Sequence, residues 1–243
     1  MTDANVKQQN LGRSVVLHLF PGVLMAIIFV IAGPLAVDAG YPSIVALLLA
    51  FLFVILPVEL GYLIYQGRKV HDTNSLEGIV VYREPIPIWQ YFALVIPLFL
   101  WLGVIATVSA PLEVQLNDTL FGWLPDWFFW AEYDISDYSS SALLVTAVLF
   151  LVVSGIAVPI VEEMYFRGYL LPRISRFGRW APVINTVLFS IYHFWSPWGL
   201  LTRVILLLPM VSAVYWKRNI YVGMLTHVLA NSIGALVFAA QIL

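Results

Sequence analysis

Seven long apolar stretches dominate this chain, and they constrain its fold more than any other feature. The hydrocarbon core of a bilayer is about 30 Å thick and requires about 20 apolar residues per helix. All seven stretches roughly meet that length, although the fifth is short. They cover residues 15–37, 44–66, 91–110, 141–169, 181–195, 200–216 and 220–243. The sequence therefore predicts an all-α, polytopic transmembrane helix bundle.

The composition supports this fold class. Of the 243 residues, 61% are hydrophobic and 11% are charged, whereas about a quarter of the residues in a soluble domain are charged. No repeat, linker or soluble segment interrupts the chain, so we expect a single integral membrane domain over residues 1–243. The chain has no cysteine, which excludes disulfides, thiolate metal ligands and a cysteine nucleophile. The basic residues form no patch, which argues against nucleic acid as a partner.

The basic residues predict the orientation of the bundle. Eleven of the twelve Lys and Arg residues fall in the N-terminal tail and in alternate loops or span ends, and Arg203 is the exception at a span edge. Because Lys and Arg collect on the cytoplasmic side, we expect a cytoplasmic N-terminus. The eleven residues are Lys7, Arg13, Arg68, Lys69, Arg83, Arg167, Arg173, Arg176, Arg179, Lys217 and Arg218.

The opposite side carries acids and an aromatic loop. Five acidic residues of the third loop and Asp38 of the first belong to this side. The stretch 120–133 contains several tryptophans, which suit a membrane–water interface. We interpret it as an interfacial anchor, with a re-entrant segment or a substrate gate as alternatives. The five acids of the third loop are Asp118, Asp126, Glu132, Asp134 and Asp137.

Three charges stand together in the fourth apolar stretch, at VEEMYFR (161–167). A charge at mid-bilayer costs at least about 2.5 kcal/mol, so each one needs a reason. Glu163 and Arg167 are four residues apart and can form an ion pair along the helix. Neighbouring residues on a helix point about 100° apart, so Glu162 and Glu163 are not expected to face one target. Glu162 is left without a local partner.

Other polar residues lie in the fifth and seventh stretches. His193 follows Phe189 by one helical turn, and the two rings can stack. His227 and Asn231 are also four residues apart and share one helix face. Polar groups of this kind need partners inside lipid. We interpret two further ionisable groups inside the predicted spans, His18 and Glu59, as structural.

Taken together, these residues resemble the CAAX prenyl endopeptidase and bacteriocin-processing membrane proteins, also known as the CPBP or Abi family. The family signature is Glu-Glu-x-x-x-Arg, then Phe-x-x-x-His, then His-x-x-x-Asn, each on a separate helix. Here the three motifs are EEMYFR (162–167), FSIYH (189–193) and HVLAN (227–231), in the same order. The resemblance covers about residues 142–243. Residues 1–140 then correspond to the variable N-terminal helices and 141–243 to the core that carries the motifs.

The resemblance implies an intramembrane protease of the glutamate type, built as an eight-helix bundle in the best-described relatives. One span would then be hidden, and the aromatic outer loop is a candidate place for it. By position, Glu162 resembles the general base and His193 would help to hold the attacking water. His227 and Asn231 would form the oxyanion site. Glu163 and Arg167 match motif positions with a supporting role, and Phe189 completes the second motif.

Peptide hydrolysis at these residues sets two structural requirements. Water must reach the site, so we expect a polar cavity that opens toward the cytoplasmic side. The scissile peptide must be extended, because an intact helix engages its own carbonyl groups. One feature fits poorly, since a rise of about 1.5 Å per residue places His193 about 18 Å deep, deeper than Glu162 or His227. A later start of the fifth helix, or a strong tilt, would remove this difference.

Several alternatives stay open from the sequence. Glu162, His193 and His227 could instead be the ligands of a catalytic zinc, since carboxylate and imidazole ligands suit that metal; the favoured mechanism needs no cofactor. The protein could also be a membrane scaffold or immunity protein that binds a peptide or partner without cutting it, or a transporter. We expect a multi-pass protein of the prokaryotic plasma membrane, with the lipid bilayer and a membrane-associated peptide or protein as its partners.

Overall fold

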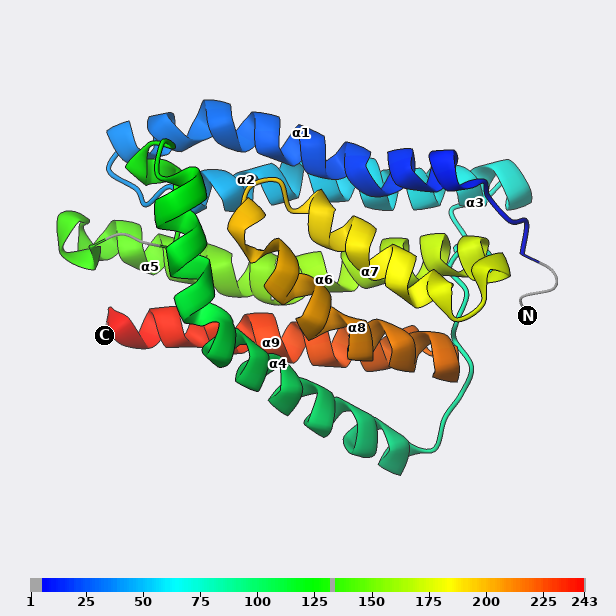
Figure 1. Cartoon of the computed structure of the whole chain (residues 1–243). Coiled ribbons are helices and arrows are strands. Elements are labelled where there is room, and N and C mark those ends of the chain that lie inside the picture. The colour runs from blue at the N-terminus through cyan, green and yellow to red at the C-terminus, as the bar shows by residue number, and fades with distance from the viewer. Residues whose placement is uncertain (1–5, 132–133, 243) are drawn as a thin grey trace.

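In a computed structural model, described for residues 6–131 and 134–242, the chain is a bundle of helices (Figure 1). Six of the described helices are long and apolar enough to cross a membrane, and a shorter apolar helix covers Trp180–Tyr192. This confirms the predicted all-α, multi-pass fold class. The six are Leu11–Asp38, Ile44–His71, Ile88–Phe121, Ser140–Phe177, Pro197–Lys217 and Ile220–Gln241.

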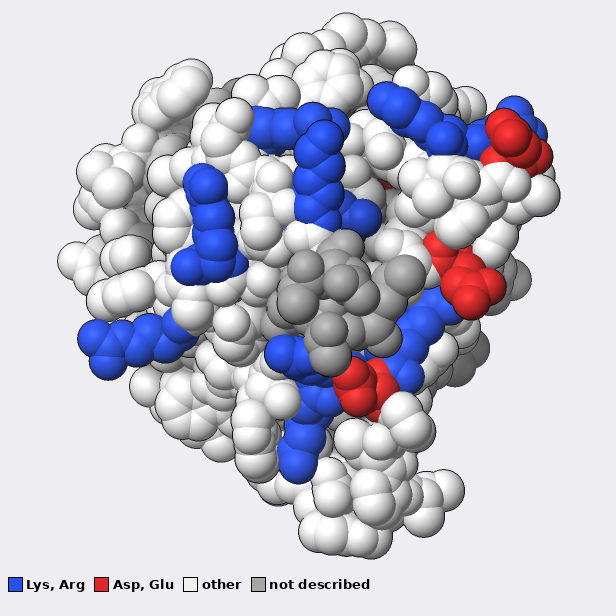
Figure 2. All heavy atoms as spheres, turned by 90° about the vertical axis from the view of Figure 1, so that its right-hand side faces the viewer, with Lys and Arg blue, Asp and Glu red and all other residues white. Residues whose placement is uncertain are grey.

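The two ends of the bundle differ in charge. Lys and Arg side chains gather over one end, the face drawn in Figure 2. We name it the basic end. Helix α1 (Leu11–Asp38) starts there and finishes at the opposite end of the bundle (Figure 1). The predicted segregation of basic residues is therefore present. Glu132 of the outer loop lies outside the described residues.

The second span is one continuous rod of three segments. Helix α2 (Ile44–Val54) passes into a wider π-helical segment, η2 (Ile55–Leu60), and then into α3 (Gly61–His71). Glu59 lies within η2 and is completely buried. Because π-helical segments are frequent at functional sites, the position of Glu59 in η2 makes it a candidate for a functional role.

The fourth span is longer than the sequence predicted. It runs from α5 (Ser140–Leu149) to the basic end at Phe177, whereas the sequence predicts an apolar span that ends at Tyr169. Glu162 therefore lies 15 residues from that end, or about 20 Å at the rise of a helix. The remaining segments are η6 (Phe150–Ala157), α6 (Val158–Glu162), η7 (Glu163–Leu170) and η8 (Leu171–Phe177).

The fifth apolar stretch turns back inside the bundle. Helix α7 (Trp180–Tyr192) runs obliquely from the basic end, and the chain reverses through η9 (Pro197–Gly199) into α8 (Leu200–Lys217) (Figure 1). Pro197 lacks the N–H that the first turn of a helix leaves unpaired, so it favours a new helix start. His193 directly follows the 13 residues of α7, so its depth of about 20 Å matches that of Glu162. This removes the difference in depth between Glu162 and His193 that the sequence suggested.

The outer loop covers this turn. Trp198 of the turn makes ring contacts with Phe121, Phe128 and Phe129. Short 3-10 turns form at η4 (Asp126–Phe128) and η5 (Ile135–Asp137), and the described residues of the loop contain no further spanning helix. The aromatic residues thus cover a re-entrant turn, and the eighth span suggested by the resemblance is not found in the described part of the loop.

Helix α4 (Ile88–Leu116), extended by η3 (Asn117–Phe121), is the most weakly buried wall of the bundle. Its buried residues are Val95 and Leu102, and it leans across α8 and α9 in Figure 1. Because its other apolar side chains are largely exposed, this helix presents most of its surface to lipid.

An extended strap closes the basic end. Val80, Val81 and Tyr82 are buried, although they belong to a loop between two spans. Val81 N–H donates to the carbonyl of Gly168 at 2.9 Å, and Ile220 N–H donates to the carbonyl of Tyr82 at 2.8 Å. The strap therefore ties the fourth span to the start of α9.

Helix α9 (Ile220–Gln241) approaches the fourth span closely. A Cβ atom on Gly155 would lie 3.3 Å from the Cα of Ser232, and Ser232 Oγ donates to the carbonyl of Gly155 at 3.2 Å. Nearer the basic end, Gly223 lies directly against the carboxylate of Glu163. Small residues thus let α9 bring its polar face against the two glutamates.

The contact at Gly223 leads to a first prediction. In Gly223→Ala the added methyl group would collide with the Glu163 carboxylate and with Val214, whose Cγ2 is 3.0 Å from the new atom. We expect a loss of about 1–3 kcal/mol in the free energy of unfolding, the usual cost of overpacking. Unfolding in mixed micelles measures it. Gly234→Ala on the same helix is the control, because a Cβ there meets no atom within 4 Å; equal stability of the two variants would contradict the prediction.

Candidate active site

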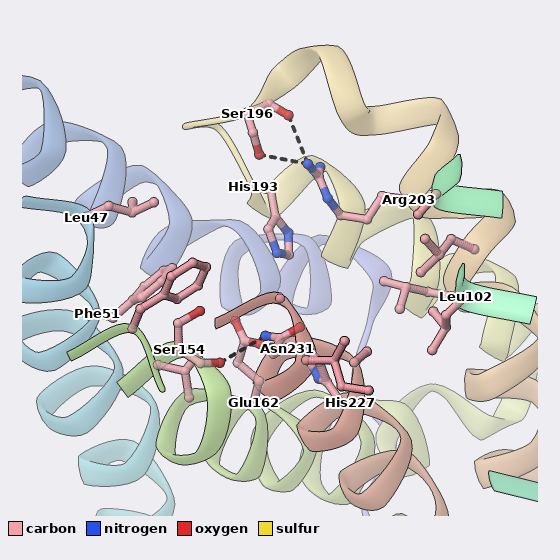
Figure 3. Close-up of a pocket in the computed structure, with 18 of the residues that line it drawn as sticks. Leu47, Phe51, Leu102, Ser154, Glu162, His193, Ser196, Arg203, His227 and Asn231 are labelled. Carbon is pink, nitrogen blue, oxygen red and sulfur yellow. Dashed lines mark hydrogen bonds and ion pairs between the residues drawn. The ribbon is translucent and has the colours of Figure 1, made fainter. Parts of the chain in front are cut away.

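Four predicted site residues line one cavity. It has a volume of about 500 Å³, and Glu162, His193, His227 and Asn231 all lie on its wall. Figure 3 shows these side chains converging from the fourth span, the end of α7 and the face of α9. The sequence predicted that the three motifs share a void, and the structure brings them together.

The rest of the cavity wall is mainly apolar, and its position differs from the prediction. Its apolar side chains come largely from α2, α4 and α8, with Trp130 from the outer loop. Among the described residues, none from the loops at the basic end lines the cavity, and the buried strap 80–82 closes that end. The lining therefore gives no support for the expected opening toward the basic end. The site faces the apolar interior between α2 and α4, which line it but make few contacts with each other.

Glu163 and Arg167 form the ion pair that their spacing predicted. Arg167 Nη1 lies 3.2 Å from Glu163 Oε1, and both side chains are completely buried. The guanidinium group also lies 4.0 Å from the ring centroid of Phe189, a cation–π contact. These two residues do not line the cavity. Glu163 and Arg167 therefore lie behind the cavity wall and support it.

His227 lies between the two glutamates. Its Nδ1 is 3.2 Å from Glu163 Oε1, and its Nε2 is 3.9 Å from Glu162 Oε2. The expectation that the adjacent glutamates cannot face one target is wrong here, because the imidazole ring offers one nitrogen to each. An ionised Glu163 can only accept, so Nδ1 carries a proton. Donation from Nε2 to a substrate then requires the doubly protonated ring.

The hydrogen bonds of His193 fix its tautomer. Its Nδ1 lies 2.7 Å from the carbonyl oxygen of Phe189. A carbonyl oxygen can only accept, so Nδ1 carries the proton and Nε2 of the neutral ring is an acceptor. The ring packs edge-on against Phe189, with centroids 4.8 Å apart. His193 can therefore accept a hydrogen bond from a water molecule in the cavity.

Asn231 is held by the fourth span. Its Nδ2 donates to the carbonyl of Ser154 at 3.0 Å, and Ser154 belongs to the π-helical segment η6. The amide group has two N–H donors, so one remains for a group in the cavity. This bond also fixes the face that α9 presents to Glu162.

Sequence reasoning missed Arg203, which also lines the cavity. Arg203 Nη1 donates to the carbonyl of Ser190 at 3.1 Å, and Nη2 donates to the carbonyl and the hydroxyl of Ser196 at 3.0 and 2.7 Å. These bonds join α8 to the turn that contains His193 (Figure 3). The signal was present in the sequence, since Arg203 is the one basic residue outside the charge alternation.

Glu59 and His18, both interpreted as structural, lie in different surroundings. His18 bonds to the Ser14 carbonyl at 2.7 Å and accepts from Asn185 Nδ2 at 3.0 Å. Both ring nitrogens are thus satisfied within the bundle, as a structural role requires. Glu59 instead accepts a hydrogen bond from Tyr192, next to His193, and so belongs to the surroundings of the site.

The arrangement of the donors bears on the zinc alternative. Within the described residues, no three His, Asp or Glu side chains come close enough together to hold a metal ion. Glu162, His193 and His227 nevertheless line one cavity. Each imidazole uses its Nδ1 in a bond to the protein, which leaves Nε2 as the nitrogen that could bind a metal. The zinc alternative therefore stays open to experiment.

Comparison with known proteins agrees with the three motifs. Residues 144–233 match the family model described as type II CAAX prenyl endopeptidase Rce1-like. This match confirms the predicted family resemblance. The Rce1-like segment contains all four cavity residues named above and the three supporting residues. At the level of the family, it supports a membrane protease that acts on a peptide or protein.

A curated relative gives a weaker likeness. Over 81 residues the chain is 36% identical to the UPF0177 protein YxdF of Lactococcus lactis subsp. lactis strain IL1403. The matched stretch covers 33% of this chain and 45% of that relative, less than half of either. No solved structure matches the chain significantly.

Proposed function

We propose that the protein is an intramembrane endopeptidase that hydrolyses a peptide bond in a membrane-associated peptide or protein. The observation that carries the proposal is the convergence of Glu162, His193, His227 and Asn231 on one cavity whose remaining wall is mainly apolar. Such groups are costly in a membrane interior and are seldom placed there without a function. The Rce1-like match over the same residues supports the reaction class.

Glu162 is the general base of the proposed reaction. A water molecule donates one proton toward the Glu162 carboxylate and the other to Nε2 of His193, which orients its lone pair toward the scissile carbonyl. As the water oxygen bonds to the carbonyl carbon, Glu162 takes the proton. When the tetrahedral intermediate collapses, the C–N bond breaks and Glu162 returns this proton to the departing amine. General acid–base help of this kind contributes about 10²–10⁴-fold.

His227 and Asn231 stabilise the negative oxygen of the intermediate. The protonated Nε2 of His227 and the second N–H of Asn231 are the donors, because their other polar groups already bond to Glu163 and Ser154. Donors of this kind contribute about 10²–10³-fold each. Glu163 holds His227, and Arg167 with Phe189 holds Glu163, so the supporting residues of the three motifs act through the ring of His227.

The surroundings of the cavity limit the substrate. Its wall faces the apolar space between α2 and α4, so the substrate reaches it from the membrane and presents an extended segment. We place the N-terminus and the basic end in the cytoplasm because basic residues favour that side. The setting is a prokaryotic plasma membrane, and residues 1–243 act as one membrane domain.

A scaffold or immunity protein is the second candidate. Its occupant would be the same class of peptide, bound in the same cavity and left intact. Detection of a new carboxylate on the peptide distinguishes the two functions, because a binding protein forms none.

The test is hydrolysis of a defined peptide in isotopic water. The probe is an internally quenched peptide that ends in a prenylated cysteine and three further residues, the class known as CAAX. We expect one cleavage product with one ¹⁸O atom in its new carboxylate when purified protein acts in H₂¹⁸O. Binding without cleavage would contradict the proposal. Comparative proteomics of membranes with wild-type or Glu162→Gln protein then identifies the natural substrate.

A chelator arm of the same assay tests the zinc alternative. Because the mechanism uses only side chains of the protein, we expect unchanged turnover after treatment with a strong zinc chelator. Loss of turnover that zinc restores would support Glu162, His193 and His227 as ligands and would contradict the glutamate mechanism.

A further inference from the structure

A cation lines the proposed site and belongs to none of the three motifs. Arg203 lies on the cavity wall and is the one basic residue outside the charge alternation. A charged side chain inside the membrane is costly and by default marks a functional position. The three hydrogen bonds that join Arg203 to the described residues all end on neutral oxygen atoms of one turn. The position of that turn shows what the cation does.

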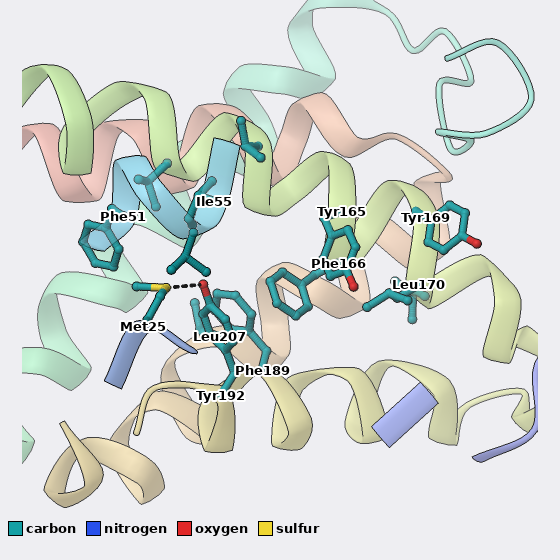
Figure 4. Close-up of a cluster of buried hydrophobic side chains, with 14 of the residues drawn as sticks. Met25, Phe51, Ile55, Tyr165, Phe166, Tyr169, Leu170, Phe189, Tyr192 and Leu207 are labelled. Atoms are coloured by element: carbon teal, nitrogen blue, oxygen red, sulfur yellow. Dashed lines mark hydrogen bonds between the residues drawn. The ribbon is translucent and has the colours of Figure 1, made fainter. Parts of the chain in front are cut away.

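Apolar packing fixes α7 only as far as Tyr192. The ring centroids of Phe189 and Tyr192 are 5.6 Å apart, and the ring of Phe166 lies 4.7 and 5.0 Å from them. Figure 4 shows these three rings together in the buried cluster. His193 is the first residue after the helix, and its backbone is not helical, with φ −79° and ψ 56°. The helix itself therefore does not fix the main chain of His193.

Two serines on either side of His193 hold its main chain. His193 N–H donates to the carbonyl of Ser190 at 3.4 Å, and Ser196 N–H donates to the carbonyl of His193 at 3.0 Å. Arg203 bonds to both serines. Its Nη1 donates to the Ser190 carbonyl at 3.1 Å, and its Nη2 donates to the carbonyl and hydroxyl of Ser196 at 3.0 and 2.7 Å. One planar guanidinium group thus spans the turn that carries His193 (Figure 3).

Gly199 allows the guanidinium group to lie against the turn. A Cβ atom on Gly199 would be 2.7 Å from Arg203 Nη2 and 3.6 Å from Oε1 of Glu113. Glu113 of α4 therefore comes close to the guanidinium group and compensates its charge. Because α4, α8 and the turn all meet at this point, the position of Arg203 is set before any substrate binds.

We propose that Arg203 is a positioning residue that holds His193 in place toward the attacking water. This inference rests on the proposed function, in which Nε2 of His193 accepts a hydrogen bond from that water. The carbonyl of Phe189 anchors the ring through Nδ1, and Arg203 anchors the main chain on both sides of it. With ring and main chain both held, Nε2 keeps its place in the cavity. Arg203 acts through the turn and not on the substrate.

Substitutions of Arg203, assayed on the prenylated, quenched peptide, test this assignment. We expect Arg203→Gln to lower kcat about 10- to 100-fold with KM nearly unchanged, because a displacement of about 1 Å at a catalytic group can cost about 100-fold. Arg203→Lys keeps the charge but loses the planar fork of donors, so it should restore only part of kcat. Full recovery in Arg203→Lys overturns the inference, and so does an effect of Arg203→Gln on KM alone.

The two serines provide a matched control. Ser196→Ala removes the 2.7 Å bond to Arg203 Nη2 and should lower kcat about 3- to 10-fold. Ser190→Ala leaves every bond of Arg203 in place, because Arg203 uses the Ser190 carbonyl. The Ser190 hydroxyl has no hydrogen-bond partner among the described residues. We therefore expect wild-type kcat in Ser190→Ala, and equal losses in the two serine variants overturn the inference.

NMR of protein labelled with ¹⁵N-histidine tests the link without turnover. The chain has four histidines, and the signals that disappear in His193→Ala belong to His193. We expect these signals to shift in Arg203→Lys, where the charge remains and only the turn is altered, and to stay in place in Ser190→Ala. The signals of His18 and His71 should stay in place in both variants.

Unshifted His193 signals in Arg203→Lys overturn the inference. So does an equal shift of all four histidines, which would indicate a role in folding alone. Failure of the proposed function is separate, because it appears as absent cleavage by the wild-type protein while the NMR comparison still gives its answer.

Discussion

Glu162→Gln is expected to lower kcat on the prenylated peptide about 10²–10⁴-fold, the contribution of general acid–base catalysis. The amide has the shape of the carboxyl group but cannot take a proton from water. The cavity would keep its volume, because the amide and the carboxyl group are nearly the same size. KM should therefore change little. A lower kcat with an unchanged KM would show that the substitution removes proton transfer and leaves substrate binding intact.

Two comparisons keep this prediction decisive. Glu84→Gln makes the same chemical change on an exposed side chain at the basic end and should leave turnover at the wild-type level. The thermal midpoint of Glu162→Gln, measured in detergent, should stay near that of the wild type. Wild-type turnover in Glu162→Gln would contradict the proposed mechanism. We expect Glu162→Gln to bind the peptide with wild-type affinity, because the substitution removes proton transfer and not binding.

The fold was predictable from the sequence where hydrophobic length decides it. Apolar runs near 20 residues gave the spans, and the alternation of Lys and Arg gave the two ends. The extension of the fourth span to Phe177 was not predictable, because RISRF (173–177) reads as a polar loop. In the structure that segment is stabilised from outside the helix. Gln9 N–H donates to the carbonyl of Arg173 at 2.8 Å, and the strap 80–82 packs beside the fourth span.

The candidate site was predictable only where its residues stand in motifs. Glu162, His193, His227 and Asn231 were found through their spacing, but spacing on a helix cannot tell which side chains meet across helices. That is why the contact of both glutamates with His227, and the bonds of Arg203 to the α7–α8 turn, were missed. Glu59 was noticed as a buried acid, yet its link to the site depends on Tyr192 from another helix.

Arg167→Met is expected to cause the largest loss of stability in the chain. The substitution keeps an apolar side chain of similar length but removes the cation that lies 3.2 Å from Glu163 Oε1 and 4.0 Å from the ring of Phe189. Glu163 would then be a completely buried carboxylate with only His227 as an ionic partner. Breaking a buried pair on one side costs about 3–5 kcal/mol. The free energy of unfolding in mixed micelles measures the loss.

A double substitution shows whether the cost comes from the stranded carboxylate. In Glu163→Gln with Arg167→Met neither position carries a buried charge, so most of the stability should return, as it does when both members of a buried pair are replaced. Turnover should stay low, because the amide no longer holds His227 as a carboxylate does. Arg176→Met is the control, since Arg176 lies exposed on the same fourth span. If the double variant is as unstable as Arg167→Met, the guanidinium group stabilises the bundle through Phe189 and not through Glu163.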